Sequence, residues 1–378
     1  LISGGAAMKG WREYRLEQFA ILVKDIYKPN GKDEQKYIGL EHIEQETLRL
    51  NSVGNSTDVI SNKFLFQAND ILFGKLRPYF RKVIKPKFSG ICSTDIWVFR
   101  AKEGFSQDFL FYFLANWDFV NTASSGEGGT RMPRADWKFL SKTKWLLPPL
   151  PEQKAITAVL SSLDDKIDLL HRQNKTLEAM AETLFRQWFV EPCKNGLPEG
   201  WEEKSLGDVA EIKAGGDKPK VFSEIKTSIC NVPVFSNGID NEGLYGYTDN
   251  PKISVESITI SARGTIGYVC LRQEPYVPIV RLISIAPNED LVSSKFLYLW
   301  AKSQIISGTG TTQQQLTVPD LSRSKLIIPS YDVMRIFTMY IDVFFNKLNF
   351  NKSQIRTLEK LRDLLLPKLM SGEVRVEV

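Results

Sequence analysis

The tetrapeptide Lys175-Thr176-Leu177-Glu178 returns 181 positions later in the chain as Arg356-Thr357-Leu358-Glu359. A second match, Trp11-Arg12-Glu13 with Trp201-Glu202-Glu203, has an offset of 190 residues, so the two copies differ in length only in their middles. This period is far longer than the roughly 20–50 residues of a solenoid repeat. The sequence therefore predicts two domain-sized copies related by a pseudo-twofold axis, an arrangement suited to a partner that itself has two halves.

The composition is typical of a globular protein without membrane segments. Of the 378 residues 43% are hydrophobic, enough for a core in each copy, and Lys plus Arg exceed Asp plus Glu by only 49 to 44. The four cysteines form no Cys-x-x-Cys pair, which argues against a zinc or redox site and favours free thiols in a reducing compartment. No apolar run reaches the roughly 20 residues of a membrane span, so we expect a cytoplasmic location. The Gly- and Ala-rich residues before Met8 are expected to be an expression remnant.

Two long helices are predicted from heptad spacing. Residues 152–189 contain neither Gly nor Pro, and their apolar residues are spaced alternately four and three apart. At about 1.5 Å per residue this helix would extend roughly 57 Å, longer than the globule beside it could cover, so we expect it to pair with its counterpart in the second copy. Pro367 is expected to bend or stop the last turn of that counterpart. The predicted seam positions are Ile156, Leu160, Leu163, Ile167, Leu170, Asn174, Leu177, Ala181, Leu184 and Trp188, and then Phe337, Ile341, Phe344, Leu348, Asn351, Ile355, Leu358, Arg362, Leu365 and Leu369.

Polar residues in the seam predict its register. A pseudo-twofold axis makes the two helices antiparallel and, if it passes beside residue 172, it places Asn174 opposite Asn351. A buried Asn pair satisfies its own hydrogen bonds and penalises slipped registers. The same register gives the layers Leu170 with Ile355, Ile167 with Leu358, Ala181 with Phe344, Trp188 with Phe337 and, as its weakest, Leu163 with Arg362.

The remaining segments predict mixed α and β structure in each copy. Runs at residues 71–74 and 258–261 follow turn residues and read as strands, whereas residues 109–114 and 296–300 occupy matching places and read as helices. We therefore predict an α+β protein with two mixed α/β domains related by internal duplication and separated by two long helices that form an antiparallel coiled coil. The predicted boundaries are 8–150 for the first domain, 151–190 for the central helix, 191–329 for the linker and second domain, and 330–378 for the C-terminal helix.

Catalytic machinery is hard to place in this sequence. The chain has only two histidines, His42 and His171, too few for most histidine triads or metal clusters. It also lacks a Gly-x-x-x-x-Gly-Lys-Ser/Thr loop, which argues against a nucleotide phosphate site. The glycines at 126, 128 and 129 do not join a strand to a helix, and a flexible turn explains them better than a dinucleotide site. We predict no catalytic residue and no metal.

Basic clusters favour nucleic-acid binding in the first copy. Residues 71–94 contain no acidic residue, while Lys75, Arg77, Arg81, Lys82, Lys85 and Lys87 alternate with Tyr79, Phe80 and Phe88. A second group follows the glycine turn: Arg131, Arg134, Lys138, Lys142 and Lys144. Either group alone is equally explained as a solvated strand face. Together they indicate contact with phosphates.

The second copy carries different side chains in the corresponding places. Residues 261–267 read Ser-Ala-Arg-Gly-Thr-Ile-Gly, and residues 310–315 read Gly-Thr-Thr-Gln-Gln-Gln. Arg and Gln can make bidentate contacts to guanine and adenine edges, so the two copies are expected to read different sequences, although a polar surface loop also explains the Gln run. The candidate DNA-binding residues are Lys75, Arg77, Tyr79, Arg81, Lys82, Arg131, Arg134, Lys138, Lys218, Lys220, Arg263, Thr265, Thr312, Gln313 and Gln314.

These features resemble a known family, the specificity subunit of type I restriction-modification systems. The resemblance covers Met8 to Val378, and the duplicated layout is its most specific part. One departure is Pro329-Ser330-Tyr331-Asp332, which lacks the Pro-Glu-Gln that starts the first long helix. The matching motifs are Asp70-Ile71-Leu72-Phe73-Gly74-Lys75-Leu76-Arg77-Pro78-Tyr79, Gly90-Ile91-Cys92-Ser93-Thr94-Asp95, Leu147-Pro148-Pro149-Leu150-Pro151-Glu152-Gln153 and the Ser261 to Gly267 turn.

The resemblance implies a division of labour. Two target-recognition domains would each read one half of a split double-stranded DNA target, and the helix pair would set the unread spacer. Two modification subunits would methylate adenine, and restriction subunits could join them and cleave DNA. S-adenosylmethionine, ATP and magnesium would then be bound by these partners and not by this chain.

Two other functions remain open at this point. A stand-alone tandem DNA-binding regulator would bind DNA without a methyltransferase and would present a conventional recognition helix, which the sequence does not reveal. A coiled-coil scaffold would show little salt-dependent affinity for DNA, whereas phosphate contacts make affinity fall steeply with salt.

Overall fold

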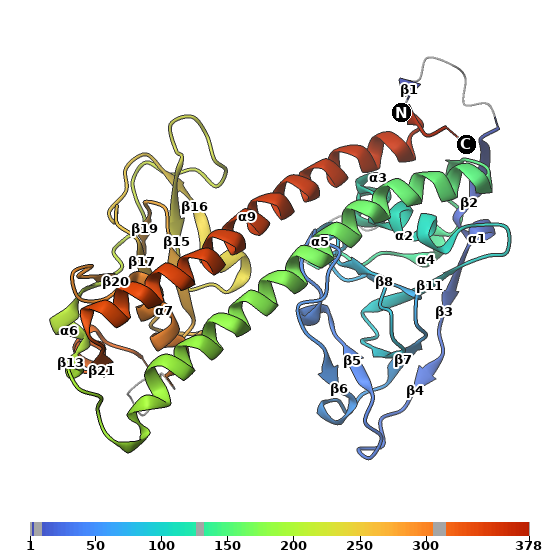
Figure 1. The fold of residues 1–378 in the computed structure, drawn as a ribbon. Coiled ribbons are helices and arrows are strands. Elements are labelled where there is room, and N and C mark those ends of the chain that lie inside the picture. The colour runs from blue at the N-terminus through green and yellow to red at the C-terminus, as the bar shows by residue number, and fades with distance from the viewer. Residues whose placement is uncertain (1, 4–9, 126–131, 305–314, 378) are drawn as a thin grey trace. The chain divides into compact units, whose positions relative to one another are not determined.

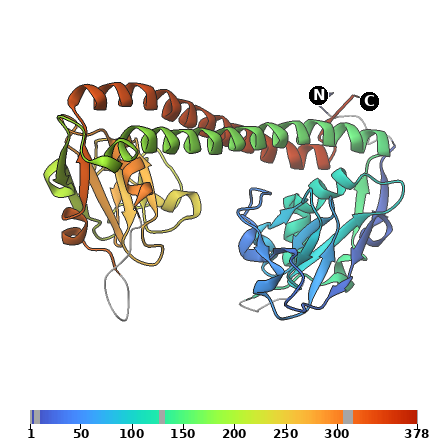
Figure 2. The same cartoon turned by 60° about the horizontal axis from the view of Figure 1, so that its bottom comes forward.

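The computed structural model describes residues 2–3, 10–125, 132–304 and 315–377 (Figure 1). The chain divides into two compact units, one made of residues 1–170 with 353–378 and the other of residues 171–352. Two long helices, α5 (Leu150–Phe185) and α9 (Tyr331–Met370), contribute one segment each to both units (Figure 2). Each unit also contains strands and short helices. These elements confirm the α+β class and the two long helices.

The first unit is built on a four-stranded sheet of order β3-β11-β8-β9 and a five-stranded sheet of order β4-β7-β10-β5-β6. The predicted strand at 71–74 and helix at 109–114 are confirmed as β8 and α2. The strands are β1 (Ile2–Ser3), β2 (Arg12–Arg15), β3 (Ala20–Val23), β4 (Ile26–Tyr27), β5 (Lys36–Ile38), β6 (Gly54–Asn55), β7 (Lys63–Phe66), β8 (Ile71–Gly74), β9 (Val83–Ile84), β10 (Gly90–Cys92), β11 (Ile96–Ala101), β12 (Lys144–Leu147) and β22 (Val374–Arg375). The helices are α1 (Leu16–Phe19), α2 (Gln107–Ala115), α3 (Trp117–Ser124) and α4 (Trp137–Leu140), with short 3₁₀ turns η1 (Leu40–His42), η2 (Ser56–Asp58) and η3 (Pro78–Phe80).

The second unit repeats the four-stranded sheet, in the order β14-β20-β17-β18, beside a three-stranded sheet of order β16-β15-β19. The predicted strand at 258–261 and helix at 296–300 are confirmed as β17 and α7. The strands are β13 (Glu202–Ser205), β14 (Ala210–Ala214), β15 (Val232–Phe235), β16 (Leu244–Thr248), β17 (Ser257–Ser261), β18 (Val269–Arg272), β19 (Val277–Pro278), β20 (Leu282–Pro287) and β21 (Lys325–Ile328). The helices are α6 (Leu206–Val209), α7 (Ser294–Ser303) and α8 (Val318–Ser322), with a π turn η4 (Arg186–Val190) and 3₁₀ turns η5 (Pro192–Asn195) and η6 (Asp240–Gly243).

The core helices α2 and α7 show why both copies fold alike. Each starts at a serine, Ser106 or Ser293, whose hydroxyl accepts a hydrogen bond from a backbone N–H of the first turn. The buried apolar runs that follow pack with the four-stranded sheets in the main core of each unit. The copies diverge in the other sheet, which has five strands in the first unit and three in the second. The change of offset in the sequence therefore falls where the sheets differ.

The helix pair confirms the predicted register. In the second unit, Asn351 Nδ2 donates to Asn174 Oδ1 at 2.9 Å, and both side chains are buried. The ring centroids of Trp188 and Phe337 lie 5.8 Å apart, as that layer requires. In the first unit, Ile167 and Leu170 cluster with Ile355 and Leu358.

The predicted seam is wrong at two positions, and the second long helix does not stop at Pro367. Phe345 is buried where Phe344 was expected, and Leu366 is buried in place of Leu365, while Phe344 and Leu365 are half-buried. Pro367 does not stop α9, which continues to Met370. A proline this close to the helix end removes one intrahelical hydrogen bond without breaking the helix.

The starts of the two long helices differ in their polar contacts. Glu152 accepts hydrogen bonds from Trp11 Nε1 at 3.1 Å and from Arg375 at 2.8 and 2.9 Å, while Gln153 Oε1 accepts from the Ser106 N–H at 2.9 Å. Val333 and Met334 occupy the equivalent places in the second copy and pack in its core. The missing Pro-Glu-Gln thus reflects a helix start that is apolar in the second unit.

Candidate nucleic-acid interface

The basic stretch of the first copy folds as a turn between β8 and β9, which we call the first turn (residues 75–81). The Gly74 N–H donates to the Lys82 carbonyl at 2.9 Å and closes its base. Arg77 and Arg81 both have left-handed backbones, with φ of 51° and 48°, and they flank the 3₁₀ turn that begins at Pro78. Two positive-φ residues around a proline produce a tight, fixed reversal of the chain.

The second basic group returns to this same turn. The Arg77 N–H donates to the Pro133 carbonyl at 2.8 Å, and the Ala135 N–H donates to the Lys75 carbonyl at 2.9 Å. The structure thereby brings Arg134, and Lys138 soon after it, to the turn that carries Lys75 and Arg77. Part of the second basic group of the sequence therefore lies beside part of the first.

Arg77 combines two unfavourable features. Its backbone is left-handed, and its Nε atom is buried without a hydrogen-bond partner among the described residues. A left-handed backbone costs about 1–2 kcal/mol for such a residue, and an unsatisfied buried donor costs about 1–3 kcal/mol. Conformations of this kind cluster at functional sites, where binding depends on them. The guanidinium lies 5.9 Å from the Phe80 ring centroid, which holds it in place.

The other candidates around the first turn differ in how accessible they are. Tyr79 is 41% exposed. Arg134 and Lys138 are exposed, and Arg134 Nη2 lies 3.3 Å from Asp95 Oδ1. Lys82 is half-buried and donates to the Leu40 carbonyl at 2.6 Å. Lys75 is half-buried on the turn itself.

The structure contradicts the prediction that Arg81 contacts DNA. Its side chain is 1% exposed and faces the interior. Its Nε donates to the Ala115 carbonyl at 2.6 Å, and its Nη2 lies 3.1 Å from Asp363 Oδ1. A guanidinium that is buried and hydrogen-bonded in this way cannot reach a phosphate. The alternation of basic and aromatic residues gave no sign of this, because it does not separate inward from outward side chains on an irregular turn.

The second copy carries an equivalent turn between β17 and β18, which we call the second turn (residues 262–267). The Ser261 N–H donates to the Tyr268 carbonyl at 3.0 Å, and the Leu316 N–H donates to the Ala262 carbonyl at 2.9 Å, as Gly74 and Ala135 do in the first copy. Here the positive-φ positions are glycines, Gly264 and Gly267, both with φ of 81°. The backbone frame is thus kept while its side chains change.

Asn237 holds the second turn from the neighbouring sheet. The Asn237 side-chain Nδ2 donates to the Arg263 backbone carbonyl at 2.8 Å. The Asn237 backbone carbonyl accepts from Thr265 Oγ1 at 2.6 Å. The Thr265 hydroxyl therefore donates its proton to a hydrogen bond within the fold, and it can only accept a hydrogen bond from a ligand. The Arg263 side chain is half-buried at the tip. Sequence reasoning missed Asn237, because it is remote in sequence and sits in an ordinary Ser-Asn-Gly turn.

The remaining candidates lie apart from the second turn or outside the described residues. Lys218 and Lys220 are exposed beside the three-stranded sheet, where Lys218 Nζ lies 3.5 Å from the Phe222 ring centroid and 5.3 Å from that of Tyr245. A cation held between two aromatic rings remains available to an anion at its free side. Four further candidates, Arg131, Thr312, Gln313 and Gln314, lie outside the described residues.

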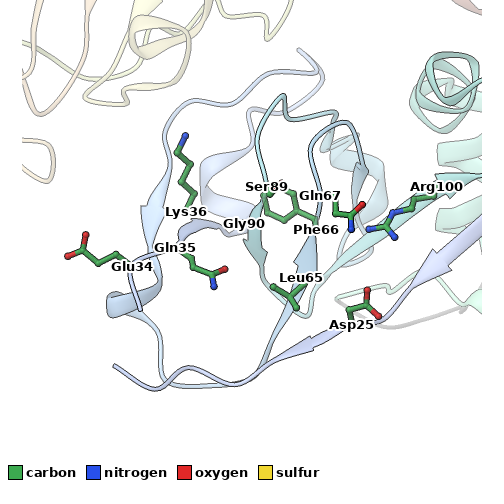
Figure 3. Close-up of a pocket in the computed structure, with 10 residues that line it drawn as sticks. All are labelled: Asp25, Glu34, Gln35, Lys36, Leu65, Phe66, Gln67, Ser89, Gly90 and Arg100. Atoms are coloured by element: carbon green, nitrogen blue, oxygen red, sulfur yellow. The ribbon is translucent and has the colours of Figure 1, made fainter. Parts of the chain in front are cut away.

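A polar bay of about 550 Å³ in the first unit is lined by none of the residues of the first turn (Figure 3). It is next to Asp70, which precedes β8, whereas the first turn follows that strand. Arg100 in its wall is engaged with Asp70 at 2.6 and 2.8 Å. Because Asp25 and Glu34 face the bay together with Lys36 and Arg100, its charges are mixed and do not suit a polyanion.

Metal and membrane chemistry find no support in the described part of the chain. No group of three or more His, Cys, Asp or Glu side chains there could hold a metal ion. Within the same residues, no helix is both long and apolar enough to cross a bilayer.

Comparison with known proteins gives the family. The family model described as "Type I restriction modification DNA specificity domain" matches residues 8–179 and again residues 198–360. The chain belongs to this family. The two matches follow the internal duplication. This specificity-domain protein therefore recognises DNA sequence in a type I restriction-modification system, as its sequence resemblance implied.

Relatives of the specificity-domain protein cover most of its length. It is 28% identical to the type I restriction enzyme MjaIX specificity subunit of Methanocaldococcus jannaschii, covering 73% of this chain and 71% of that protein. It is 23% identical to the HindI specificity subunit of Haemophilus influenzae, covering 97% and 100%. The fold is similar to a type I restriction-modification S subunit from M. genitalium, with a TM-score of 0.55 and 16% identity over 97% of this chain and 96% of that one.

Proposed function

We propose that the chain reads a bipartite DNA target, with the first turn contacting one half-site and the second turn the other. The observation that supports this is the pair of turns: they share their closing hydrogen bonds and each has two positive-φ residues, but they carry different side chains. The first turn presents Lys75, Arg77 and Tyr79, whereas the second presents Arg263 and Thr265. Two turns that are closed in the same way but present different side chains suit a target whose halves differ in sequence.

The two turns would divide phosphate and base contacts differently. At the first turn, Arg77, with Arg134 and Lys138 beside it, would hold the DNA backbone, which fixes position and not sequence, while the exposed Tyr79 on the same turn would meet the base edges of the first half-site. Arg263 could make a bidentate contact to guanine O6 and N7, and Thr265 could accept a hydrogen bond from a base amino group. Each wrong base pair would cost about 1–3 kcal/mol.

Arg77→Ala tests the role of the first turn. If Arg77 contacts a phosphate, log Kd plotted against log salt should lose about 0.9 from its slope, while the ranking of target sequences stays the same. Lys175→Gln removes one exposed positive charge from α5 and serves as the control. A relaxed preference at one base pair, with an unchanged slope, would reassign Arg77 to base readout. Equal slopes for wild type and Arg77→Ala, with no change in preference, would remove the first turn from the interface.

We further propose that this chain is not catalytic and that its partners supply the chemistry. Two modification subunits would transfer a methyl group from S-adenosylmethionine to adenine, and restriction subunits that use ATP and magnesium would cleave DNA. An adenine-methylation map of cells with the modification subunit, recorded with and without this chain, tests the proposal. Loss of one split motif is expected when the chain is absent. An unchanged map, with both proteins present, would contradict it.

An apolar row on α9 is the surface we propose for a modification subunit. Ile336, Tyr340, Val343 and Phe350 follow heptad spacing on a face next to the seam, and their side chains are exposed by 37 to 64%. A row with this spacing suits an apolar helix of a partner. Val343→Asp should weaken assembly with the modification subunit by more than tenfold, whereas Asn349→Asp, close by on the same helix, should not. Equal assembly of both variants would place the partner elsewhere.

A further inference from the structure

An ion cluster built around two buried arginines connects the first turn to the helix pair of the first unit. The cluster consists of Arg81, Arg362, Asp164 and Asp363. Both arginines are 1% exposed, whereas the side chains of Asp164 and Asp363 are 25% and 37% exposed. Arg81 Nη2 lies 3.1 Å from Asp363 Oδ1, and Arg362 Nη1 lies 3.0 Å from Asp164 Oδ1. Arg362 Nε also lies 3.3 Å from Asp363 Oδ1, so this carboxylate is shared by both guanidinium groups. The cluster carries two positive and two negative charges and is neutral as a whole.

The cluster extends into the recognition domain through hydrogen bonds. Arg81 donates to the Ala115 carbonyl at the end of α2, and its guanidinium lies 5.3 Å from the Trp117 ring centroid. Asp164 also accepts a hydrogen bond from the Tyr112 hydroxyl at 2.6 Å. Burial raises the pKa of Tyr112 and the Asp164 carboxylate raises it further, so the phenol stays protonated and donates.

The electrostatics show that Arg81 depends on its partner. Burial lowers the pKa of Arg81, and Asp363 opposes that shift only in part. Burial also acts to lower the pKa of Arg362, but Asp164 and Asp363 outweigh it and the pKa is raised. Removing one charge from such a buried group leaves the others uncompensated, which is far more costly than removing an exposed pair.

The backbone of the first turn is fixed by the same contacts. Arg81 is the last residue of the turn and has a φ of 48°. Its Nη1 donates to the Glu46 carbonyl at 3.3 Å, while the Glu46 N–H donates to the Phe80 carbonyl at 3.3 Å. Glu46 therefore holds the end of the turn twice, through the Arg81 side chain and through the Phe80 main chain. Arg81 lies four residues after Arg77. Asp363 on α9 lies at the far end of this chain of contacts.

We propose that Arg81 and Asp363 are positioning residues that hold the first turn in the geometry needed to discriminate the first half-site. This inference rests on the proposed function, since it concerns how the turn meets DNA and not whether it does. Neither residue touches DNA. They act through the backbone at Arg77 and Tyr79, and they make half-site selection depend on the helix pair of the same unit.

The test uses the full chain assembled with its modification subunits. Asp363→Asn keeps the shape of the carboxylate and removes its charge, and Arg81→Lys keeps a charge but loses the forked donors. Competition binding compares the intact target with DNA scrambled in the first half-site or in the second. Lys352→Gln is the matched control, because it removes the exposed ion pair between α9 and Glu242 in the second unit. Thermal unfolding is recorded for every variant.

For Asp363→Asn we expect discrimination of the first half-site to fall about tenfold, a change of about 1.4 kcal/mol, with discrimination of the second half-site unchanged. Adding Arg77→Ala should then weaken binding less than it does in the wild type, since residues that act through one another are not additive. Lys352→Gln should leave discrimination of the first half-site intact.

Three outcomes would overturn the proposal. Equal loss at both half-sites would show a general effect on stability. Full additivity of Asp363→Asn with Arg77→Ala would show that the cluster does not act through the turn. Unchanged discrimination in both Asp363→Asn and Arg81→Lys would show that the cluster only supports the fold. A wild-type complex that binds all DNA equally would instead contradict the proposed function itself.

Discussion

The first and second turns are closed by matching hydrogen bonds but hold their backbones by different means. The first has arginines at its two positive-φ positions, and one of them, Arg81, is buried in an ion cluster. The second has Gly264 and Gly267 there, and Asn237 holds it through neutral hydrogen bonds. Glycine adopts a left-handed backbone without steric cost, whereas arginine does so only when its surroundings compensate.

The comparison indicates which parts of a duplicated recognition domain can vary. The closing hydrogen bonds to Lys82 and Tyr268 and the order of the four-stranded sheets are the same in both copies. The contacts that hold each turn differ between the copies, and so do the side chains that each turn presents. A turn held by glycines can exchange its side chains independently, while a turn held by a buried arginine is tied to the helix pair.

The largest effect expected from this difference is that of Arg81→Met. It should lower the free energy of unfolding by about 2–3 kcal/mol, because the Ala115 and Glu46 carbonyls lose a donor and Asp363 keeps only Arg362 as a charge partner. Denaturant unfolding measures the loss. Arg134→Met, at an exposed position on the neighbouring segment, should change it by less than about 0.5 kcal/mol. Equal losses for the two variants would show that burial of Arg81 contributes nothing.

Gly264→Ala tests the second turn and should have an intermediate effect. At a φ of 81° an alanine is strained, and its Cβ would lie 3.1 Å from Asn237 Nδ2. We expect a loss of about 1–2 kcal/mol in the free energy of unfolding. Gly264→Asn should cost less, because asparagine tolerates left-handed backbones better. If both substitutions are neutral in denaturant unfolding, the turn does not need glycine there.

The helix pair was predictable from sequence because two packed helices need apolar residues at regular heptad spacing. Heptad spacing and two polar seam residues gave the register, and the Asn174–Asn351 hydrogen bond confirms it. The strand and helix positions at residues 71–74 and 109–114 followed equally from short apolar runs with clear turn or capping residues. Local patterns of this kind act over a few residues, so one sequence is enough to read them.

The candidate site was less predictable because it depends on contacts between distant residues. Arg77 and Arg81 are alike in sequence and both left-handed, yet Arg77 belongs to a half-buried surface and Arg81 to the core. What separates them is Asp363, which lies 282 residues after Arg81. Asn237 was missed for the same reason. No spacing rule links a turn to a carboxylate on the last helix.

Arg77→Gly should show whether the left-handed arginine of the first turn serves stability or DNA binding. Glycine relieves the left-handed strain of about 1–2 kcal/mol, but it gains backbone freedom in the unfolded chain worth about 0.5–1 kcal/mol. The net expectation is a gain of about 0.5 kcal/mol in the free energy of unfolding, together with weaker DNA binding. Denaturant unfolding and salt-dependent binding on the same samples check both parts. A less stable variant would show that Arg77 supports the fold.

The smallest expected effect concerns Glu256, which immediately precedes β17 and so supports the strand that leads into the second turn. Burial acts to raise its pKa, but hydrogen bonds from Ser294 and Lys295 outweigh burial and lower the pKa below its ordinary value of 4.5. A depressed folded-state pKa stabilises the protein above the unfolded pKa, and this contribution disappears as the pH falls through the folded pKa. Glu256→Gln should therefore cost only about 0.3 kcal/mol at pH 7 and nothing in strong acid, as measured by unfolding between pH 3 and 7. A difference between wild type and variant that stays constant over this range would show that the charge of Glu256 is not what holds β17, and that the second turn is held by neutral contacts alone.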